Sequence, residues 1–444
     1  MAAIVRALAE PHRPAVRFNS LGKVITVESL PFAVEPVPWY AHRACRCPGG
    51  VRPAASPLFA AGAYYVQDAA SLLPVALLEA RPGELVCDLC ASPGGKATAI
   101  LEDLGETGWL LINEPVQSRL PPLLLNLARH GSTRWALTCM DPYELADALG
   151  PIFDAVLVDA PCSAQSLAGR EKRPARAFDP RVIEYNAARQ ARILACAVRL
   201  LRPGGRLVYS TCTFAWDENE RQFAALVERC PGLRPLPAPR LRAYEVPEPA
   251  PPACYRLWPH RDDCAGGFAA RLATDDIIDA DASVSRPAQP LPARRVRCRR
   301  GRAFVRRRIG YRPPPPDLST DAWGTWIEPL CLDVRTEQAF GWPNGLPEGF
   351  AEVARAGPEV AFRKGHTWFP AYSLAMRRDG AFRAHGTAAA SLEAARRFLR
   401  GEAISGSSAG WVVVTHQGLP LGWARGDGRV LTSHLPKPAR LVLP

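Results

Sequence analysis

The sequence lacks the features that would place this chain in a membrane or direct it to secretion. Among its 444 residues no apolar run reaches 18 residues, whereas a membrane-spanning helix needs about 20. The N-terminus has no basic start followed by an apolar run and a cleavage site, so a secretory signal is not expected. We therefore expect a cytoplasmic protein without a membrane partner.

The cysteine pattern does not suit a disulfide framework or a structural zinc site. The chain has 13 cysteines, an odd number scattered along its length, unlike the paired cysteines of small secreted domains. Cys45 and Cys47 are one residue apart, which is poor spacing for zinc ligands. We expect free thiols in a reducing compartment and no bound metal.

The chain also has less acid than base. Lys and Arg total 55 against 43 Asp and Glu, a formal net charge of +12. A basic balance favours a polyanionic partner, usually nucleic acid, because binding releases counterions. The alternative is a soluble protein from a GC-rich genome in which Arg replaces Lys, and charge alone leaves both open.

Short apolar runs separated by helix-length segments indicate an α/β fold. The runs are Leu85–Cys87, Leu110–Ile112, Ala155–Val158 and Arg206–Tyr209. Such runs are typical of strands buried on both faces of a parallel sheet. Before the last run, Tyr185–Leu201 carries an apolar stripe with helical spacing. This alternation, over about 150 residues, predicts a doubly wound α/β domain.

The ends of the chain differ from this central part. Residues 1–60 are rich in Pro and Arg, with one short strand expected at Val24–Val27. After Leu272, acidic residues precede a run of ten arginines without an acid between residues 294 and 312. That run is either a solvated linker or a contact for RNA phosphates. Near the C-terminus, residues 411–423 predict a β-hairpin in a small β-rich domain.

A glycine turn follows the first apolar run of the α/β region. Gly94 and Gly95 allow the backbone to turn tightly and approach a ligand. Glu114 stands twenty residues after Gly94, at the end of the next run. This is the arrangement of dinucleotide sites, in which the carboxylate binds ribose hydroxyls. A glycine turn alone is typical of any strand–helix connection, so this prediction depends largely on Glu114.

Polar and thiol groups follow two further strands. Asp159 and Cys162 come after one, and Cys212 comes after the next. Ligands bind at the carboxyl ends of strands in open α/β sheets, so these groups should face the cleft. A lone cysteine is more often an inert buried residue than a nucleophile. Two cysteines at strand ends beside a cofactor loop are harder to explain by packing.

Cytosine chemistry explains this set of groups. Carbon 5 of cytosine is a poor nucleophile, but addition of a thiolate to carbon 6 makes carbon 5 enamine-like and able to attack a methyl group. Protonation of the ring nitrogen beside the carbonyl helps this addition, which suits a carboxylic acid such as Asp159. The carbon-5 proton must then leave and the thiol must be expelled.

In these motifs the chain resembles the Sun-related RNA cytosine-5 methyltransferases, which have a Rossmann-like class I fold. The matching segments, in order, are Tyr64–Asp68, Cys90–Lys96, Asn113–Glu114, Asp159–Ser163, Leu201–Gly205, Tyr209–Glu220, Arg256–His260 and Gly266–Phe268. The resemblance implies that Cys212 is the nucleophile and that Cys162 assists release of the methylated RNA. It implies S-adenosylmethionine as cofactor, with contacts from Cys90, Ala91, Ser92, Pro93, Gly94, Gly95, Lys96, Glu114, Asp141 and Asp159.

The last third of the chain is similar to the bacterial RsmF-type enzymes, which methylate 16S ribosomal RNA. The similar stretches are Phe369–Ala375 and residues 410–437. The resemblance implies a monomer that acts on 16S rRNA or the small ribosomal subunit, and Arg17, Phe18 and Asn19 resemble remnants of an N-terminal RNA-binding module. The expected parts are an RNA-binding module at 1–60, the methyltransferase domain at 61–272, a linker at 273–322, a pre-PUA module at 323–385 and a PUA-like RNA-binding domain at 386–444.

One loop departs from the family pattern. After Ser163 the family continues with Gly-Glu-Gly, an aromatic residue and a basic pair, whereas this chain continues with Ala164 and reaches a basic residue only at Arg170 or Lys172. Three alternatives stay open: a transfer RNA substrate, a catalytically idle RNA-binding ribosome-assembly factor, and a methyltransferase of a small molecule or protein. The last would leave the two cysteines unexplained.

Overall fold

The structure is a computed structural model that describes residues 2–170, 174–275, 296–297, 303–304, 318, 320–328 and 330–441. Most of the predicted linker with its arginine run, and Lys172, lie outside the described residues. No helix in the described part of the chain is long and apolar enough to cross a bilayer.

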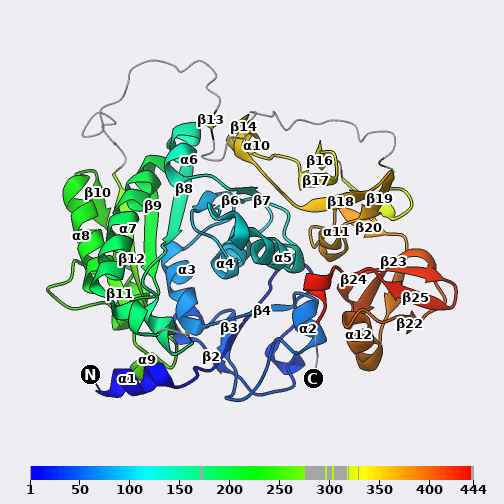
Figure 1. Cartoon of the computed structure of the whole chain (residues 1–444), viewed down its shortest axis with the longest axis horizontal. Helices are drawn as coiled ribbons and strands as arrows, with labels where there is room; N and C mark the ends of the chain where they lie inside the picture. The colour runs from blue at the N-terminus through cyan, green and yellow to red at the C-terminus, as the bar shows by residue number, and fades with distance from the viewer. Residues whose placement is uncertain are drawn as a thin grey trace.

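A sheet of eight strands, parallel in its centre, forms the core of the molecule (Figure 1). The strands run in the order β10-β12-β9-β8-β5-β6-β7, with β11 paired to β12. Strands β5 to β9 pair in parallel and β10 to β12 antiparallel. Their bounds are β5 Leu85–Asp88, β6 Trp109–Asn113, β7 Trp135–Thr138, β8 Phe153–Asp159, β9 Leu201–Thr211, β10 Leu233–Pro235, β11 Cys254–Leu257 and β12 Gly267–Thr274.

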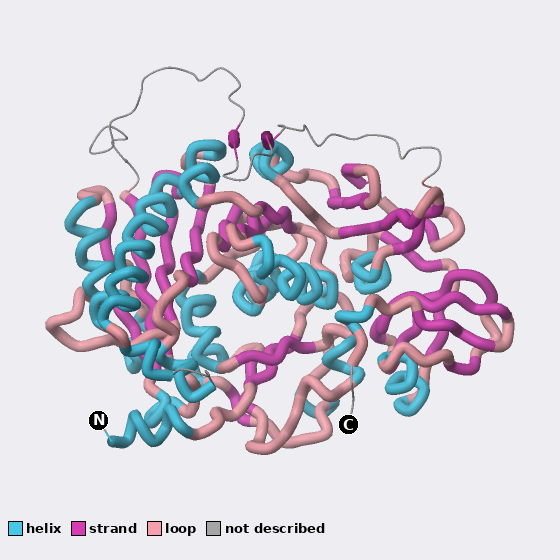
Figure 2. Tube along the Cα trace, in the orientation of Figure 1, coloured by secondary structure: helices cyan, strands magenta, loops and turns pink. Residues whose placement is uncertain are grey.

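Helices enclose this sheet, as Figure 2 shows. Helices α3, α4 and α5 pack side by side, and α6, α7 and α8 form a second group. The central strands are therefore buried along their length, which explains their continuous apolar sequences. Their bounds are α3 Leu73–Leu78, α4 Gly95–Leu104, α5 Leu120–His130, α6 Pro142–Leu149, α7 Pro180–Leu200 and α8 Glu220–Arg229.

The doubly wound α/β prediction is thus confirmed, with local corrections. Helix α7 begins before Tyr185 because the side chain of Asp179 caps it by accepting from the Arg181 backbone N–H. No strand forms at Val24–Val27, where both valines are exposed and a 3-10 turn starts at Val27. Strand β7 was absent from the predicted set.

The N-terminal residues form a four-stranded antiparallel sheet in the order β2-β3-β1-β4. Its last strand in the sequence, β4, leads directly into the α/β region of the chain. The bounds are α1 Ala2–Ala9, β1 Ala15–Phe18, β2 Glu35–Pro36, β3 Ala44–Arg46, α2 Pro57–Ala60 and β4 Tyr64–Gln67.

The C-terminal part is rich in strands. One sheet runs β16-β17-β18-β19, a ribbon pairs β15 with β20, and a last sheet runs β21-β23-β24-β25-β22 beside α12. The predicted hairpin is confirmed as β23 and β24. The bounds are β15 Gly324–Trp326, β16 Leu330–Val334, β17 Gln338–Pro343, α10 Glu348–Val353, β18 Glu359–Lys364, β19 Thr367–Pro370, α11 Tyr372–Met376, β20 Phe382–Ala384, β21 Thr387–Ala389, α12 Leu392–Leu399, β22 Ile404–Ser405, β23 Ala409–His416, β24 Leu419–Asp427 and β25 Val430–Ser433.

The hydrophobic cores cross these sequence segments. Trp342 of β17 is fully buried in the same cluster as the α/β sheet, and its indole N–H donates to the Trp135 carbonyl at 2.8 Å. The backbone of Ala356 pairs with Leu137 at the edge of β7. A second cluster joins the N-terminal sheet to the last sheet, for example through Tyr64 and Leu421. The segments therefore fold against one another.

Replacing Trp342 with alanine should destabilise the whole chain. Removal of a fully buried indole from a shared core costs about 3–5 kcal/mol, so the α/β region and the C-terminal part should melt together at a lower temperature in calorimetry. Ile327→Ala is the control, because this side chain is 56% exposed. A normal melting transition for the α/β region in Trp342→Ala would contradict the shared core.

Candidate active site

A pocket of about 240 Å³ opens where β5 meets α4. Gly94 precedes α4 with a φ of +107°, a conformation that favours glycine. A Cβ on Gly95 would lie 3.2 Å from side-chain atoms of both Gln67 and Tyr65. The pocket is lined by Tyr65, Val66, Gln67, Asp68, Ser71, Asp88, Cys90, Ala91, Ser92, Pro93, Gly95, Lys96 and Asp159.

This pocket fits a polar nucleotide-like cofactor. The amide nitrogen and oxygen of Gln67 are buried in its wall without a hydrogen-bond partner in the described part of the chain. Buried polar groups are nearly always hydrogen-bonded, so a bound ligand would complete the set. The glycine turn also brings the backbone of the α4 N-terminus close to such a ligand.

Four charged side chains line this pocket, namely Asp68, Asp88, Lys96 and Asp159. The Lys96 ammonium donates to Asp159 Oδ2 at 2.7 Å, and the Ser210 hydroxyl donates to the other oxygen of Asp159 at 2.8 Å. Burial lowers the pKa of Lys96, but the neighbouring carboxylate of Asp159 outweighs this effect and raises it. Asp88 is fully buried, and burial followed by the nearby charge of Asp159 raises its pKa to about 7.

Two acids predicted as cofactor ligands do not line this pocket. Glu114 directly follows β6 and is 1% exposed. One of its oxygens accepts from the Val116 backbone N–H at 2.9 Å, and the other lies 3.4 Å from Arg119. Asp141 is exposed and caps α6 by accepting from the Tyr143 backbone N–H. Arg119 nevertheless joins Glu114 to the Cys90–Lys96 loop, because it also donates to the Ser92 carbonyl at 2.8 Å.

Arg17 contacts the Cys90–Lys96 cofactor loop and the first turn of α4 from inside the protein. Its fully buried guanidinium donates to the Gly95 carbonyl at 2.8 Å and to the Thr98 hydroxyl at 2.9 Å, and it pairs with Glu102 at 3.1 Å. Asn19 is also buried, and its side-chain amide donates to two backbone carbonyls. Both side chains are buried inside the protein, where they hold backbone segments together.

The two candidate cysteines meet at the ends of β8 and β9. Their sulfur atoms lie 3.2 Å apart, Cys162 in the loop after β8 and Cys212 directly after β9. The hydrogen bond with Cys212, followed by burial, raises the pKa of Cys162 well above its usual value. Either sulfur can be the donor in this contact.

Buried hydrogen bonds fix both cysteine loops. Glu218 accepts from the Ser163 backbone N–H and from the Gln190 amide, each at 2.9 Å, and the Ser163 hydroxyl lies 2.7 Å from that of Thr213. Glu218 and Gln190 were not among the predicted site residues. Only the family-like stretch that contains Glu218 could have indicated it, because its partners are distant in sequence.

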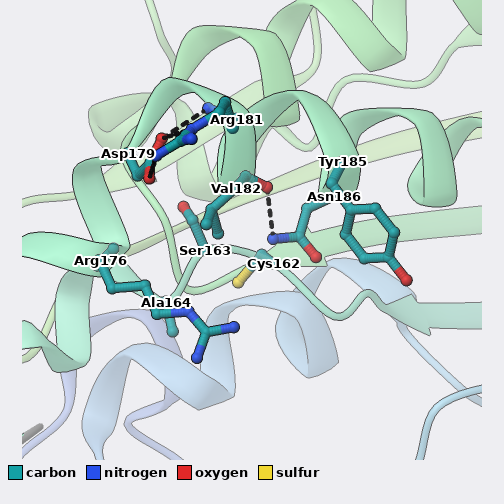
Figure 3. Close-up of a pocket in the computed structure, with 10 residues that line it drawn as sticks. Cys162, Ser163, Ala164, Arg176, Asp179, Arg181, Val182, Tyr185 and Asn186 are labelled. Carbon is teal, nitrogen blue, oxygen red and sulfur yellow. Dashed lines mark hydrogen bonds and ion pairs between the residues drawn. The ribbon is translucent and has the colours of Figure 1, made fainter. Parts of the chain in front are cut away.

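A larger pocket, of about 560 Å³, opens beside Cys162 (Figure 3). It is lined by Cys162, Ser163, Ala164, Arg176, Ala177, Asp179, Arg181, Val182, Tyr185 and Asn186. The loop that departs from the family pattern forms part of its wall. Ala164 adopts a φ of +60°, which favours the glycine that the family has there. Two residues later, the Ser166 backbone N–H donates to the Cys212 carbonyl at 3.1 Å.

The described residues contain no group of three or more His, Cys, Asp or Glu side chains that could hold a metal ion. Cys87 and Cys90 have the two-residue spacing of many metal ligands but are both buried at the end of β5, beside the pocket described above.

Comparison with known proteins identifies the class. Residues 75–273 match the family profile described as 16S rRNA methyltransferase RsmB/F, and residues 387–441 match the methyltransferase RsmF PUA domain. A solved structure, a methyltransferase homolog protein from Pyrococcus horikoshii, is 26% identical with a TM-score of 0.53, covering 61% of this chain and 90% of that one. Together with the fold, these matches define a Rossmann-like, S-adenosylmethionine-dependent RNA methyltransferase with a C-terminal PUA domain.

Curated relatives narrow the class to a family. Ribosomal RNA small subunit methyltransferase F from Enterobacter sp. (strain 638) is 30% identical over 465 residues, covering 98% of this chain and 91% of the relative. The protein of the same name from Klebsiella pneumoniae (strain 342) has the same identity and coverage. The chain therefore belongs to the family of ribosomal RNA small subunit methyltransferase F.

Cofactor affinity should depend on pH through Asp88. Its carboxyl ionises near pH 7, and the negative form attracts the cationic sulfonium cofactor, so binding measured by calorimetry should strengthen between about pH 6 and 8. Asp88→Asn should weaken binding and flatten this dependence, whereas Asp427→Asn, at an exposed end of β24, should not. If cofactor binding by Asp88→Asn keeps the same pH dependence, a group other than Asp88 causes that dependence.

The raised pKa of Asp88 also makes the stability of the cofactor-free protein depend on pH. Because the folded state holds the Asp88 proton more tightly than the unfolded chain, this residue should lower the free energy of unfolding as pH rises from about 4 toward 7.

Proposed function

We propose that this chain transfers a methyl group to carbon 5 of cytosine in 16S ribosomal RNA, through a covalent bond between Cys212 and the base. The observation that carries the proposal is the thiol pair, with 3.2 Å between its sulfurs, on strands whose ends also hold the cofactor pocket. The relatives are named ribosomal RNA small subunit methyltransferase F, and this name supports ribosomal RNA of the small subunit as the substrate.

The cofactor in this proposal is S-adenosylmethionine, which when bound supplies an electrophilic methyl group. The loop Cys90–Lys96 and Asp159 would contact it in the smaller pocket. Glu114 and Asp141 are proposed as further contacts from the ends of the next two strands. Glu114 would reach the ligand after Arg119, 48% exposed and only 3.4 Å away, gives up its present contact.

Attack on the base depends on which sulfur ionises. We assign the attack to Cys212 and give Cys162, whose sulfur lies 3.2 Å from that of Cys212, a role only after the attack. Cys212 then adds to carbon 6 of cytosine. Asp159 is proposed to protonate the ring nitrogen, and the Lys96 ammonium, which donates to Asp159 at 2.7 Å, holds this carboxyl group in position.

Release reverses the first step. After methyl transfer the carbon-5 proton leaves to a base, the bond between carbon 6 and sulfur breaks, and Cys212 departs as a thiolate. The Cys162 S–H, within hydrogen-bond distance of that departing sulfur, stabilises the leaving group. The larger pocket beside Cys162, with Arg176 and Tyr185 in its wall, is the proposed place for the target nucleotide.

The remaining parts of the chain are proposed to bind the rest of the RNA. In this division residues 1–60 and 386–444 are RNA-binding modules, 61–272 is the methyltransferase domain, and 273–322 and 323–385 are a linker and a pre-PUA module. A monomer in the cytoplasm, where ribosomal RNA is modified, completes the proposal. The alternative of an idle assembly factor would leave the thiol pair and its hydrogen bonds without a purpose.

The two cysteines should have separable roles. Cys212→Ala should abolish methyl transfer, because no other group can add to carbon 6. Cys162→Ala should still add to the base but release it slowly, so that a denaturant-resistant RNA–protein adduct accumulates on a gel. The double variant should form no adduct. If Cys212→Ala accumulates the adduct and Cys162→Ala does not, the two roles are reversed.

The substrate can be tested independently of the mechanism. Bisulfite sequencing of ribosomal and transfer RNA after incubation with the protein and S-adenosylmethionine should show new 5-methylcytosine in 16S rRNA and none with Cys212→Ala. Methylation confined to transfer RNA would replace the proposed substrate and leave the chemistry intact.

A further inference from the structure

Four aromatic rings lie next to one another in series between the two C-terminal sheets. Phe362 and Phe369, from β18 and β19, stack with centroids 5.7 Å apart. Phe369 meets Trp411 of β23 edge-on at 6.2 Å, and Trp411 lies 4.6 Å from the ring of His434, just after β25. We call these four rings the aromatic platform. In Figure 1, β18 and β19 lie in one sheet of the C-terminal part of the chain, and β23 and β25 lie in the other.

The platform is open to solvent. His434 is exposed and the other three rings are half-buried. By contrast Trp423, behind Trp411, is fully buried and donates its indole N–H to the Ala371 carbonyl at 3.0 Å. Trp423 therefore packs in the core, whereas the platform rings keep part of their surface exposed to solvent.

Positive charge surrounds these rings. The Lys364 ammonium lies 5.5 Å from the ring centre of Phe362 and 5.8 Å from that of Phe369, and the Arg425 guanidinium lies 5.9 Å from that of Trp411. Both cations are exposed, and neither joins an ion pair within the described residues. Burial, followed by these two cations, lowers the pKa of His434. The platform thus combines flat apolar faces with uncompensated positive charge.

This combination matches the chemistry of an unpaired nucleic-acid strand. Bases of a single strand expose faces that stack on aromatic side chains, while its phosphates pair with Lys and Arg. In a duplex those faces are hidden between neighbouring base pairs, so only the phosphates remain available. An acidic protein would use the cations but would leave the flat rings without a matching partner.

We propose that the aromatic platform binds an unpaired segment of the RNA substrate, with bases stacked on its rings and phosphates held by Lys364 and Arg425. The proposal rests on the proposed function in taking RNA as the partner. It adds a second contact, separate from the target-nucleotide pocket, that selects RNA by its lack of base pairing. Because β18 and β19 supply half of the rings, the surface extends beyond the matched PUA region at 387–441.

Binding of short RNA probes to the full chain tests this proposal. The probes are a fluorescent oligoribonucleotide of about 12 nucleotides, the same strand in a duplex, and an abasic strand of equal length, because stacking requires exposed bases. Fluorescence anisotropy should show the unpaired strand binding at least tenfold more tightly than the other two. Equal affinity for the unpaired and abasic strands would overturn the proposal.

Substitutions separate stacking from charge. Trp411→Leu should weaken binding of the unpaired strand by about tenfold, the loss typical of one stacked base, and leave its salt dependence unchanged. The pair Lys364→Ala and Arg425→Ala should reduce the slope of log affinity against log salt by about 0.7 per lost phosphate contact. Arg396→Ala, on the exposed face of α12, is the matched charge control. An effect of Arg396→Ala equal to that of each platform cation would indicate unspecific attraction and contradict the platform.

Two further measurements keep the outcome clear. If Trp411→Leu lowers the melting temperature, His434→Ala provides a second test of stacking. It removes an exposed ring and should not disturb the core. Binding is measured without cofactor, so that it does not depend on methyl transfer. No methyl transfer by the unmodified chain, with normal probe binding, would count against the proposed function alone. Normal methyl transfer with no preference for unpaired RNA would count against the platform alone.

Discussion

The parallel pairing of β8 with β9 sets the position of the reactive groups. In this register Asp159 lies opposite Ser210, so the loops that follow leave the sheet at the same level. Cys162 and Cys212 then come within 3.2 Å of each other although 50 residues separate them. A shift of either strand by one residue would reverse the facing of its side chains. The chemistry of the site is therefore a direct product of strand register.

Buried ion pairs hold the surroundings of that register in place. Arg256 forms two hydrogen bonds, at 2.5 and 2.6 Å, with the buried carboxylate of Glu220 behind the Cys212 loop. Arg17 and His130 both contact Glu102 under the cofactor loop. Removing one member of such a pair leaves the other charge buried and uncompensated, which costs more than the pair itself contributes. These pairs thus make the loop positions hard to alter.

The part of this structure that could be predicted from the sequence is the part determined by local pattern. Apolar runs located β5, β6, β8 and β9, and strand ends located Cys162 and Cys212, because burial on both faces of a sheet and the direction of parallel strands leave regular signals. Strand β7 has the same length as β5, but its sequence contains alanine, which is depleted in strands, and it gave a weaker signal. The contacts of Arg17 with the cofactor loop join residues 78 and 81 positions apart, and no local pattern records such a contact.

The cluster that joins the first sheet to the last also bears on how the chain is made. It contains Val16 and Ala439, so its members are translated almost a full chain length apart. A ribosome that synthesises this protein releases the N-terminal strands long before their packing partners exist. The apolar face of that sheet must wait, exposed, until the final strands emerge. This packing is consequently completed only after the strands of the last sheet have been translated, and a chain that lacks those strands leaves the apolar residues of the first sheet without their packing partners.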